Sequence, residues 1–107
     1  MLKVCNIDIG KSKEIFEELK KLAEKIKKDF EAEVYLFGSF ATGEFTETSD
    51  IDLLIIGNFK GKMPERISEI LKLTELPVEP LCYTKEEFER KKNNPFFKSI
   101  LKEAKKL

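Results

Sequence analysis

Histidine and tryptophan are absent from this sequence of 107 residues, and cysteine occurs only twice. The absence of histidine excludes Ser-His and Cys-His nucleophile pairs and histidine-based metal sites. Any general base therefore has to be a carboxylate, a lysine, a tyrosine or a cysteine. Cys5 and Cys82 lie far apart and lack the spacing of metal ligands, so we expect two free thiols in a reducing compartment. A disulfide between them is the alternative.

Long apolar runs are also missing. No stretch of about 18 apolar residues could cross a membrane, and the N-terminus does not read as a signal peptide. These absences predict a cytoplasmic protein without membrane attachment. Twenty basic residues balance twenty acidic ones, so the overall charge gives no strong footprint for nucleic-acid binding. The length predicts one domain, residues 1–107, with a modest core.

Hydrophobic periodicity predicts an alternation of helices and strands. Apolar residues recur every three or four positions from Ser12 to Phe30, which is typical of an amphipathic helix. Further helices are expected after Gly38, from Pro64, after a capping box at Thr84, and over 96–107; strands are expected over 33–37, 50–56 and 76–83. This order predicts an α+β fold in α/β order, with a small three-stranded mixed sheet covered by helices.

Two helices have apolar stripes that predict buried faces. The helix after Pro64 should bury Ile67, Ile70, Leu71 and Leu73. In the last helix we expect Phe96, Phe97 and Ile100 to pack internally, because a chain this small needs them in its core. A dimer seam is the alternative for these three residues.

The stretch from Val34 to Ile56 is the most informative part of the chain. Asp50 and Asp52 are two residues apart at the start of an expected strand, so both project from one face. Paired carboxylates of this kind suit Mg²⁺, with substrate phosphates as further ligands. The Gly38-Ser39 turn before them would let backbone N–H groups approach an anion closely. The alternative is ordinary turn chemistry and strand capping.

An apolar strand, Gly38-Ser39, ten residues, Asp50-Ile51-Asp52 and a second apolar run form a combined pattern. This pattern resembles the signature of the nucleotidyltransferase superfamily that includes DNA polymerase β. At this length the chain is most similar to the minimal nucleotidyltransferases. The resemblance implies the nucleotidyltransferase fold.

Glu79 is the candidate for a third carboxylate. Two metal ions about 3.5–4 Å apart need more than one pair of acids, and the family pattern places its third acid shortly before a helix start like Thr84-Lys85-Glu86-Glu87. The alternative is a charge that protects an edge strand from aggregation, since Pro80 confines this strand to an edge or a first position. The sequence departs from the family in having glutamate rather than aspartate here, and Thr42 where many members have arginine or lysine. Lys60, Lys62 or the group Lys85, Arg90, Lys91 and Lys92 could supply that cation, or could simply be solvated.

The resemblance implies roles for individual residues. Asp50 and Asp52 would bind two Mg²⁺ ions, with Mn²⁺ as the alternative metal, and Glu79 would complete one site and take the proton of the attacking hydroxyl. Gly38 and Ser39 would hold the β- and γ-phosphates of a nucleoside triphosphate, expected to be ATP. Ser49 would orient Asp50 or touch phosphate, or else cap its own backbone.

The leading functional hypothesis is transfer of AMP from ATP to a hydroxyl of a protein or RNA. The resemblance further implies a role as the antitoxin partner of a HEPN-domain protein. A different hypothesis is a binding module that neutralises its partner by contact and keeps the acids as a relic or for nucleotide sensing. Adenylylation of an aminoglycoside is a third hypothesis, and the absence of a second domain to hold the drug argues against it.

Overall fold

The structure is a computed structural model that describes residues 9–44 and 50–107. The elements follow in the order α1 (Ile9–Phe30), β1 (Glu33–Phe37), α2 (Ser39–Thr42), β2 (Ile51–Ile56), α3 (Met63–Leu71), β3 (Val78–Tyr83), α4 (Lys85–Lys91), α5 (Pro95–Glu103) and β4 (Lys105–Lys106). The predicted alternation of helices and strands is confirmed. The first helix already includes Ile9, three residues before its predicted start, and Asp50 directly precedes β2 instead of opening it.

The four strands form one mixed sheet in the order β3-β2-β1-β4. β1 is antiparallel to both of its neighbours, while β2 and β3 run parallel and are connected through α3. The predicted mixed sheet is therefore confirmed. β3 is an edge strand, as Pro80 predicted, because proline cannot donate a ladder hydrogen bond to a second neighbour.

The predicted number of strands was wrong, because the last helix does not continue to Leu107. It ends at Glu103, and the next residues pair with β1, placing Lys105 beside Leu36 and Lys106 beside Tyr35. The backbone N–H of Leu107 also donates to the carbonyl oxygen of Val34 at 2.8 Å. Backbone groups along the outer side of β1 need partners, and the end of the chain supplies them there.

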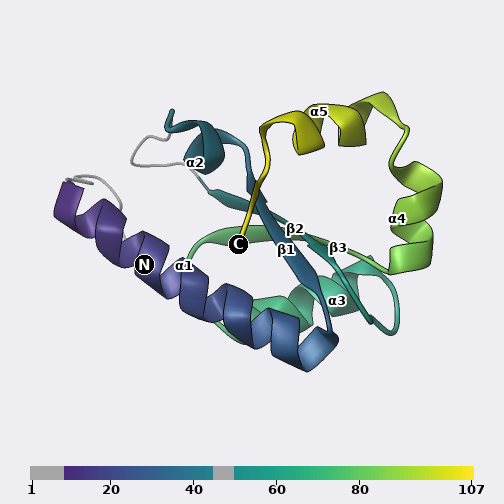
Figure 1. Cartoon of the computed structure of the whole chain (residues 1–107). Helices are drawn as coiled ribbons and strands as arrows, with labels where there is room; N and C mark the ends of the chain where they lie inside the picture. Colours follow the sequence, from purple (N-terminus) through teal and green to yellow (C-terminus); the bar gives the residue numbers. More distant parts are fainter. Residues whose placement is uncertain (1–8, 45–49) are drawn as a thin grey trace.

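The sheet has α1 and α3 on one face and α5 on the other (Figure 1), and it separates two groups of apolar side chains. On one face, α1 and α3 cover the alternate strand residues Leu36, Leu53 and Cys82. On the other face, Phe97 and Ile100 of α5 cover Leu54 and Ile56. Strand residues point alternately to the two faces, so Asp52 belongs to the same face as Leu54, which is the face that α5 packs against.

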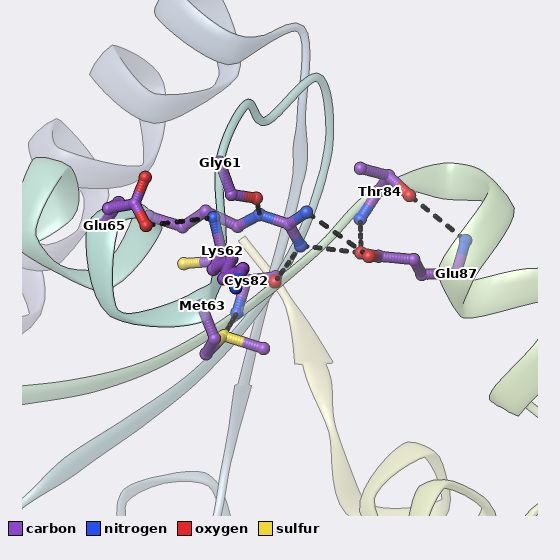
Figure 2. Close-up of polar contacts among 8 residues, drawn as sticks. Gly61, Lys62, Met63, Glu65, Cys82, Thr84 and Glu87 are labelled. Carbon is purple, nitrogen blue, oxygen red and sulfur yellow. Dashed lines mark hydrogen bonds and ion pairs between the residues drawn. The ribbon is translucent and has the colours of Figure 1, made fainter.

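The buried side of α3 differs from its prediction. Ile70 is fully buried as expected, but Leu71 is 45% exposed, and Arg66 is buried instead. The Arg66 guanidinium donates to the carbonyl oxygens of Gly61 and Cys82 and forms an ion pair with Glu87, with 2.6 Å between Nη1 and Oε1 (Figure 2). These bonds satisfy the buried charge and connect α3, β3 and α4.

The start of α4 confirms the predicted capping box. The hydroxyl of Thr84 accepts a hydrogen bond from the backbone N–H of Glu87 at 3.1 Å, and the Glu87 carboxylate accepts one from the N–H of Thr84 at 2.9 Å (Figure 2). The Glu87 carboxylate therefore caps α4 and also forms the ion pair with Arg66. These interactions hold the pKa of Glu87 at about 2, chiefly through the hydrogen bond with Arg66.

The packing of α5 confirms two of three predictions. Phe97 and Ile100 are buried, whereas Phe96 is 55% exposed, so its predicted internal packing was wrong. Phe96 lies in the first helical turn on a different side of α5 from its neighbour. Cys82 is a buried free thiol, as predicted, while Cys5 lies outside the described residues. Within the described part of the chain, no helix is long and apolar enough to cross a membrane.

Candidate active site

The sheet register brings the three predicted carboxylates to one end of the sheet. Asp52 lies between its paired neighbours, Phe37 on antiparallel β1 and Glu79 on parallel β3. Paired residues on neighbouring strands project from the same face, and Asp50 precedes Asp52 by one strand period. Asp50 and Glu79 are exposed and Asp52 is partly buried. The acids therefore form an accessible cluster on the face that α5 also occupies.

The surroundings of Asp52 and Glu79 disfavour the ionised forms of these two carboxyl groups. The pKa of Glu79 is raised, chiefly by a hydrogen bond with Asp50 and then by the negative charge of Asp50. The pKa of Asp52 is also raised, first by burial and then by the charge of Asp50, while a hydrogen bond with Glu79 opposes the rise. Each carboxylate is close enough to affect its neighbours, so the cluster is a genuine juxtaposition of acids.

The donor chemistry of this cluster fits a divalent cation. All three groups offer carboxylate oxygens, which Mg²⁺ prefers, and a cation would relieve the repulsion that raises the pKa values of Asp52 and Glu79. The side chains currently pair with one another. Within residues 9–44 and 50–107, no three acids or thiols already stand in metal-binding geometry. Binding of a metal ion would therefore require these carboxylates to rotate towards it.

Gly38 connects the predicted phosphate turn to the acid cluster. It has φ 73° and ψ −156°, a conformation that only glycine adopts readily. A Cβ atom at this position would overlap Oδ2 of Asp52. The backbone of the turn therefore lies directly against the carboxylate, and both the conformation and the contact require glycine.

The remaining predicted site residues have different outcomes. Ser39 begins α2 directly after Gly38, as expected, whereas Ser49 lies outside the described residues. The Thr42 hydroxyl lies 3.4 Å from the carbonyl oxygen of Ser39 and 3.5 Å from that of Gly38, so it reinforces α2 but provides no charge. Phe37 was predicted only as a strand residue, yet the register of β1 and β2 pairs it with Asp52. The antiparallel register of β1 and β2, which the sequence patterns do not specify, is the signal that identifies it.

The cations suggested as substitutes at Thr42 are at the wrong end of the sheet. Lys60 and Lys62 follow the last residue of β2, and the basic residues of α4 follow the last residue of β3. The carboxylates lie at the first residues of these parallel strands, and six residues span about 17–20 Å. These groups therefore cannot take the place of a cation at residue 42 without a large rearrangement.

A mixed sheet with this acid cluster beside a Gly-Ser turn defines a nucleotidyltransferase. Residues 19–107 match the model of the nucleotidyltransferase domain family, and the chain belongs to this family. The crystal structure of a Sulfolobus solfataricus protein, provisionally described as a nucleotidyltransferase, shares the fold with a TM-score of 0.60. The two chains are 24% identical, and the match covers 84% of this chain and 82% of the other.

Two proteins of Methanocaldococcus jannaschii are similar in sequence, and the names of both assign them provisionally to the protein adenylyltransferases. MJ0604 is 33% identical over 75 residues, which cover 69% of this chain and 75% of the relative. MJ0141 is 34% identical over 79 residues, covering 67% of this chain and 79% of the relative. These similarities confirm the predicted resemblance to the minimal nucleotidyltransferases.

Replacement of Gly38 by alanine should impair nucleotidyl transfer more than it impairs folding. The new methyl group would displace the Asp52 carboxylate, and a displacement of about 1 Å at a reacting centre can cost about a hundredfold in rate. The strained backbone should lower the free energy of unfolding by about 1–3 kcal/mol. Steady-state transfer rates and urea unfolding would measure the two effects separately.

Gly43→Ala is the matched control for this prediction. Gly43 also has a positive φ, 83°, but a Cβ atom there would meet nothing within 4 Å. This variant should carry a smaller backbone cost, because Gly43 has the left-handed helical conformation (ψ 6°), which alanine adopts more easily than that of Gly38. It should keep most of its transfer activity. Equal losses of activity in the two variants would show that backbone strain alone, and not the contact with Asp52, accounts for the effect.

Proposed function

We propose that this nucleotidyltransferase transfers AMP from ATP to a hydroxyl of a macromolecular acceptor, in a reaction that depends on divalent metal ions. The observation that carries this proposal is the convergence of Asp50, Asp52 and Glu79 from two adjacent parallel strands beside Gly38. Three acids on an accessible sheet face fit metal-assisted phosphoryl chemistry better than a structural role, because their repulsion destabilises the fold when no cation is bound.

Each residue has a defined part in the proposed reaction. Asp50, Asp52 and Glu79 would hold Mg²⁺ or Mn²⁺, which would neutralise charge on the phosphates. Gly38 and Ser39 would seat the β- and γ-phosphates and present the α-phosphorus to the acceptor. The acceptor oxygen forms a bond to the α-phosphorus, the bond from that phosphorus to the bridging oxygen breaks, and pyrophosphate leaves. Glu79 takes the proton of the acceptor hydroxyl.

The proposed acceptor is a protein, with RNA as the second choice. The names of the two Methanocaldococcus relatives support a protein acceptor and adenylylation. The accessible cluster, at one end of the sheet, also suits a macromolecule that approaches from outside. A HEPN-domain protein as the acceptor and partner, an antitoxin role in that pair and a cytoplasmic location with ready access to ATP complete the proposal.

A contact-binding module is the second candidate function, and Thr42 favours it. A neutral side chain stands where many family members have a cation, and Lys60, Lys62 and the α4 cations lie at the far end of the sheet. Such a protein would neutralise its partner without transferring AMP. Inhibition of the partner that survives loss of transfer would identify this function.

Removal of the metal should abolish transfer. Purified protein incubated with α-labelled ATP, Mg²⁺ and a host-cell extract should place label on one macromolecule and release pyrophosphate. An excess of EDTA should reduce labelling at least a hundredfold, because three uncompensated carboxylates repel the triphosphate, and added Mn²⁺ should restore it. Ribonuclease or protease treatment would then assign the acceptor class. Labelling that persists in EDTA would refute the metal dependence.

A further inference from the structure

Phe37 adjoins the acid cluster on the same face of the sheet. It pairs with Asp52 across β1 and β2, so the two side chains project to one face, with their Cβ atoms about 4.5–5.5 Å apart. Phe37 also directly precedes Gly38, whose backbone lies against the Asp52 carboxylate. A substrate held by Gly38 and the carboxylates is therefore within reach of the Phe37 side chain.

The aromatic side chains of this face and of the helices beside it differ in their partners. Three rings make edge-on contacts with Phe97, namely those of Tyr83, Phe88 and Phe96. The ring of Tyr35 has the ammonium group of Lys106 at 6.0 Å from its centre. Within the described part of the chain, Phe37 is the one aromatic of this set that has neither a ring nor a cation as its partner.

The apolar cover of this face is incomplete near the acids. Leu54 and Ile56 are buried under α5, whereas Phe37 and Leu101 belong to the margin of the same apolar cluster and are only partly buried. The end of α5 lies on the side of β1, because the residues that follow α5 pair with this strand (Figure 1). A partly open apolar surface therefore borders the acid cluster at Phe37.

The proposed reaction divides the site into sides. In-line displacement places the acceptor oxygen and the leaving pyrophosphate on opposite sides of the α-phosphorus. In the function proposed above, pyrophosphate lies at Gly38, after β1, and the acceptor hydroxyl lies at Glu79 on the edge strand β3. The nucleoside leaves the α-phosphorus across this line, and the apolar surface at Phe37 is the part of the face beside the acids that suits a base.

We propose that the Phe37 side chain is the platform on which the base of the nucleoside triphosphate stacks. This inference rests on the function proposed above and assigns a residue to the nucleoside, whereas the residues named there hold phosphate and metal. Bases stack on aromatic rings with little dependence on sequence, and a purine offers more stacking area than a pyrimidine. ATP should therefore bind more tightly than UTP. An acceptor side chain fits the platform less well, because the acceptor approaches the open edge at Glu79.

The absence of tryptophan from the chain makes stacking directly observable. In Phe37→Trp, the indole is the only tryptophan fluorophore, and α,β-methylene-ATP with Mg²⁺ should quench its emission in a saturable way. Tripolyphosphate, which has no nucleoside, should leave the emission nearly unchanged. Tyr35→Trp is the matched control, because Tyr35 lies on the same strand and face, one strand period further from the acids. It should respond weakly to both ligands.

The affinity of a second variant measures the contribution of the ring. Phe37→Leu keeps an apolar side chain and removes the ring, so it should weaken binding of α,β-methylene-ATP by about tenfold or more in calorimetry. Its affinity for tripolyphosphate should stay within about twofold of the wild type. Tyr35→Leu should leave both affinities within about twofold, and the melting temperature of each variant would confirm that it is folded.

The possible results separate this inference from the proposed function. Equal weakening of both ligands by Phe37→Leu, an unchanged affinity for the analogue, or equal quenching in the two tryptophan variants would overturn the platform. Nucleoside-dependent binding through Phe37 without any transfer would support the platform and refute the proposed transfer. Transfer together with binding that does not depend on Phe37 would do the reverse. Failure of the wild type to bind either ligand in Mg²⁺ would overturn both.

Discussion

Asp52→Asn should lower AMP transfer by about a thousandfold while leaving the protein folded. Asp52 lies between Phe37 and Glu79 and against Gly38, at the centre of the acid cluster. Loss of its charge should remove several kcal/mol of transition-state stabilisation by the bound metals, and each 1.36 kcal/mol is a tenfold change in rate. Transfer of label from α-labelled ATP, measured at saturating Mg²⁺, would give this ratio.

The stability of the same variant should move in the opposite direction. The pKa of Asp52 is raised in the folded protein. Ionisation of Asp52 therefore opposes folding once the pH exceeds the pKa that this group has in the unfolded chain. Asparagine has nearly the same shape without the charge, and the melting temperature at pH 7 in EDTA should be equal or higher. A clearly lower melting temperature would mean that Asp52 supports the fold, and the loss of transfer would then reflect unfolding. Glu44→Gln, at an exposed acid after α2, controls for loss of one negative charge.

Local patterns were sufficient to predict the acid cluster. Asp50 and Asp52 follow the two-residue period of a strand, and Glu79 precedes a helix start that the capping box at Thr84 fixes in sequence. Pro80 in turn predicts an edge strand, and β3 is an edge. All of these signals act over a few residues, and the parallel register of β2 and β3 then places Asp52 beside Glu79. The close approach of Gly38 to Asp52 could not be predicted from local patterns, because it depends on how β1 and β2 pair.

Other features depend on residues far away in the sequence. Lys105 and Lys106 have no strand pattern of their own, and they form β4 because the outer side of β1 offers backbone partners there. Arg66 lies one helical turn before Ile70 on the buried side of α3, a position that a charged side chain rarely takes without a partner. It is buried because Glu87, 21 residues later in the sequence, pairs with it. Phe96 was expected inside because it is apolar, but Phe97 already occupies the position that faces the sheet.

The pair of Arg66 and Glu87 should be the most sensitive polar interaction in the described fold. Glu87→Ala should lower the free energy of unfolding by about 3–5 kcal/mol, because it leaves the buried guanidinium without its partner. It also removes the acceptor for the backbone N–H of Thr84 at the start of α4. For a domain of this size, such a loss lowers the melting temperature by more than about 10 °C. Urea unfolding at pH 7 would measure the free-energy difference directly.

The pH dependence of that difference identifies the ion pair as its cause. The pKa of Glu87 is about 2 in the folded protein against an ordinary value of 4.5, so its stabilisation is complete above pH 4.5 and declines as the pH falls towards 2. The gap in stability between wild type and Glu87→Ala should therefore narrow over this range. Glu86→Ala, at the exposed neighbouring position in the same helical turn, should cost at most about 1 kcal/mol at pH 7. A gap that stayed constant from pH 7 to pH 2.5 would mean that Glu87 stabilises α4 through packing, and that the buried charge of Arg66 is satisfied by the carbonyl oxygens of Gly61 and Cys82 alone.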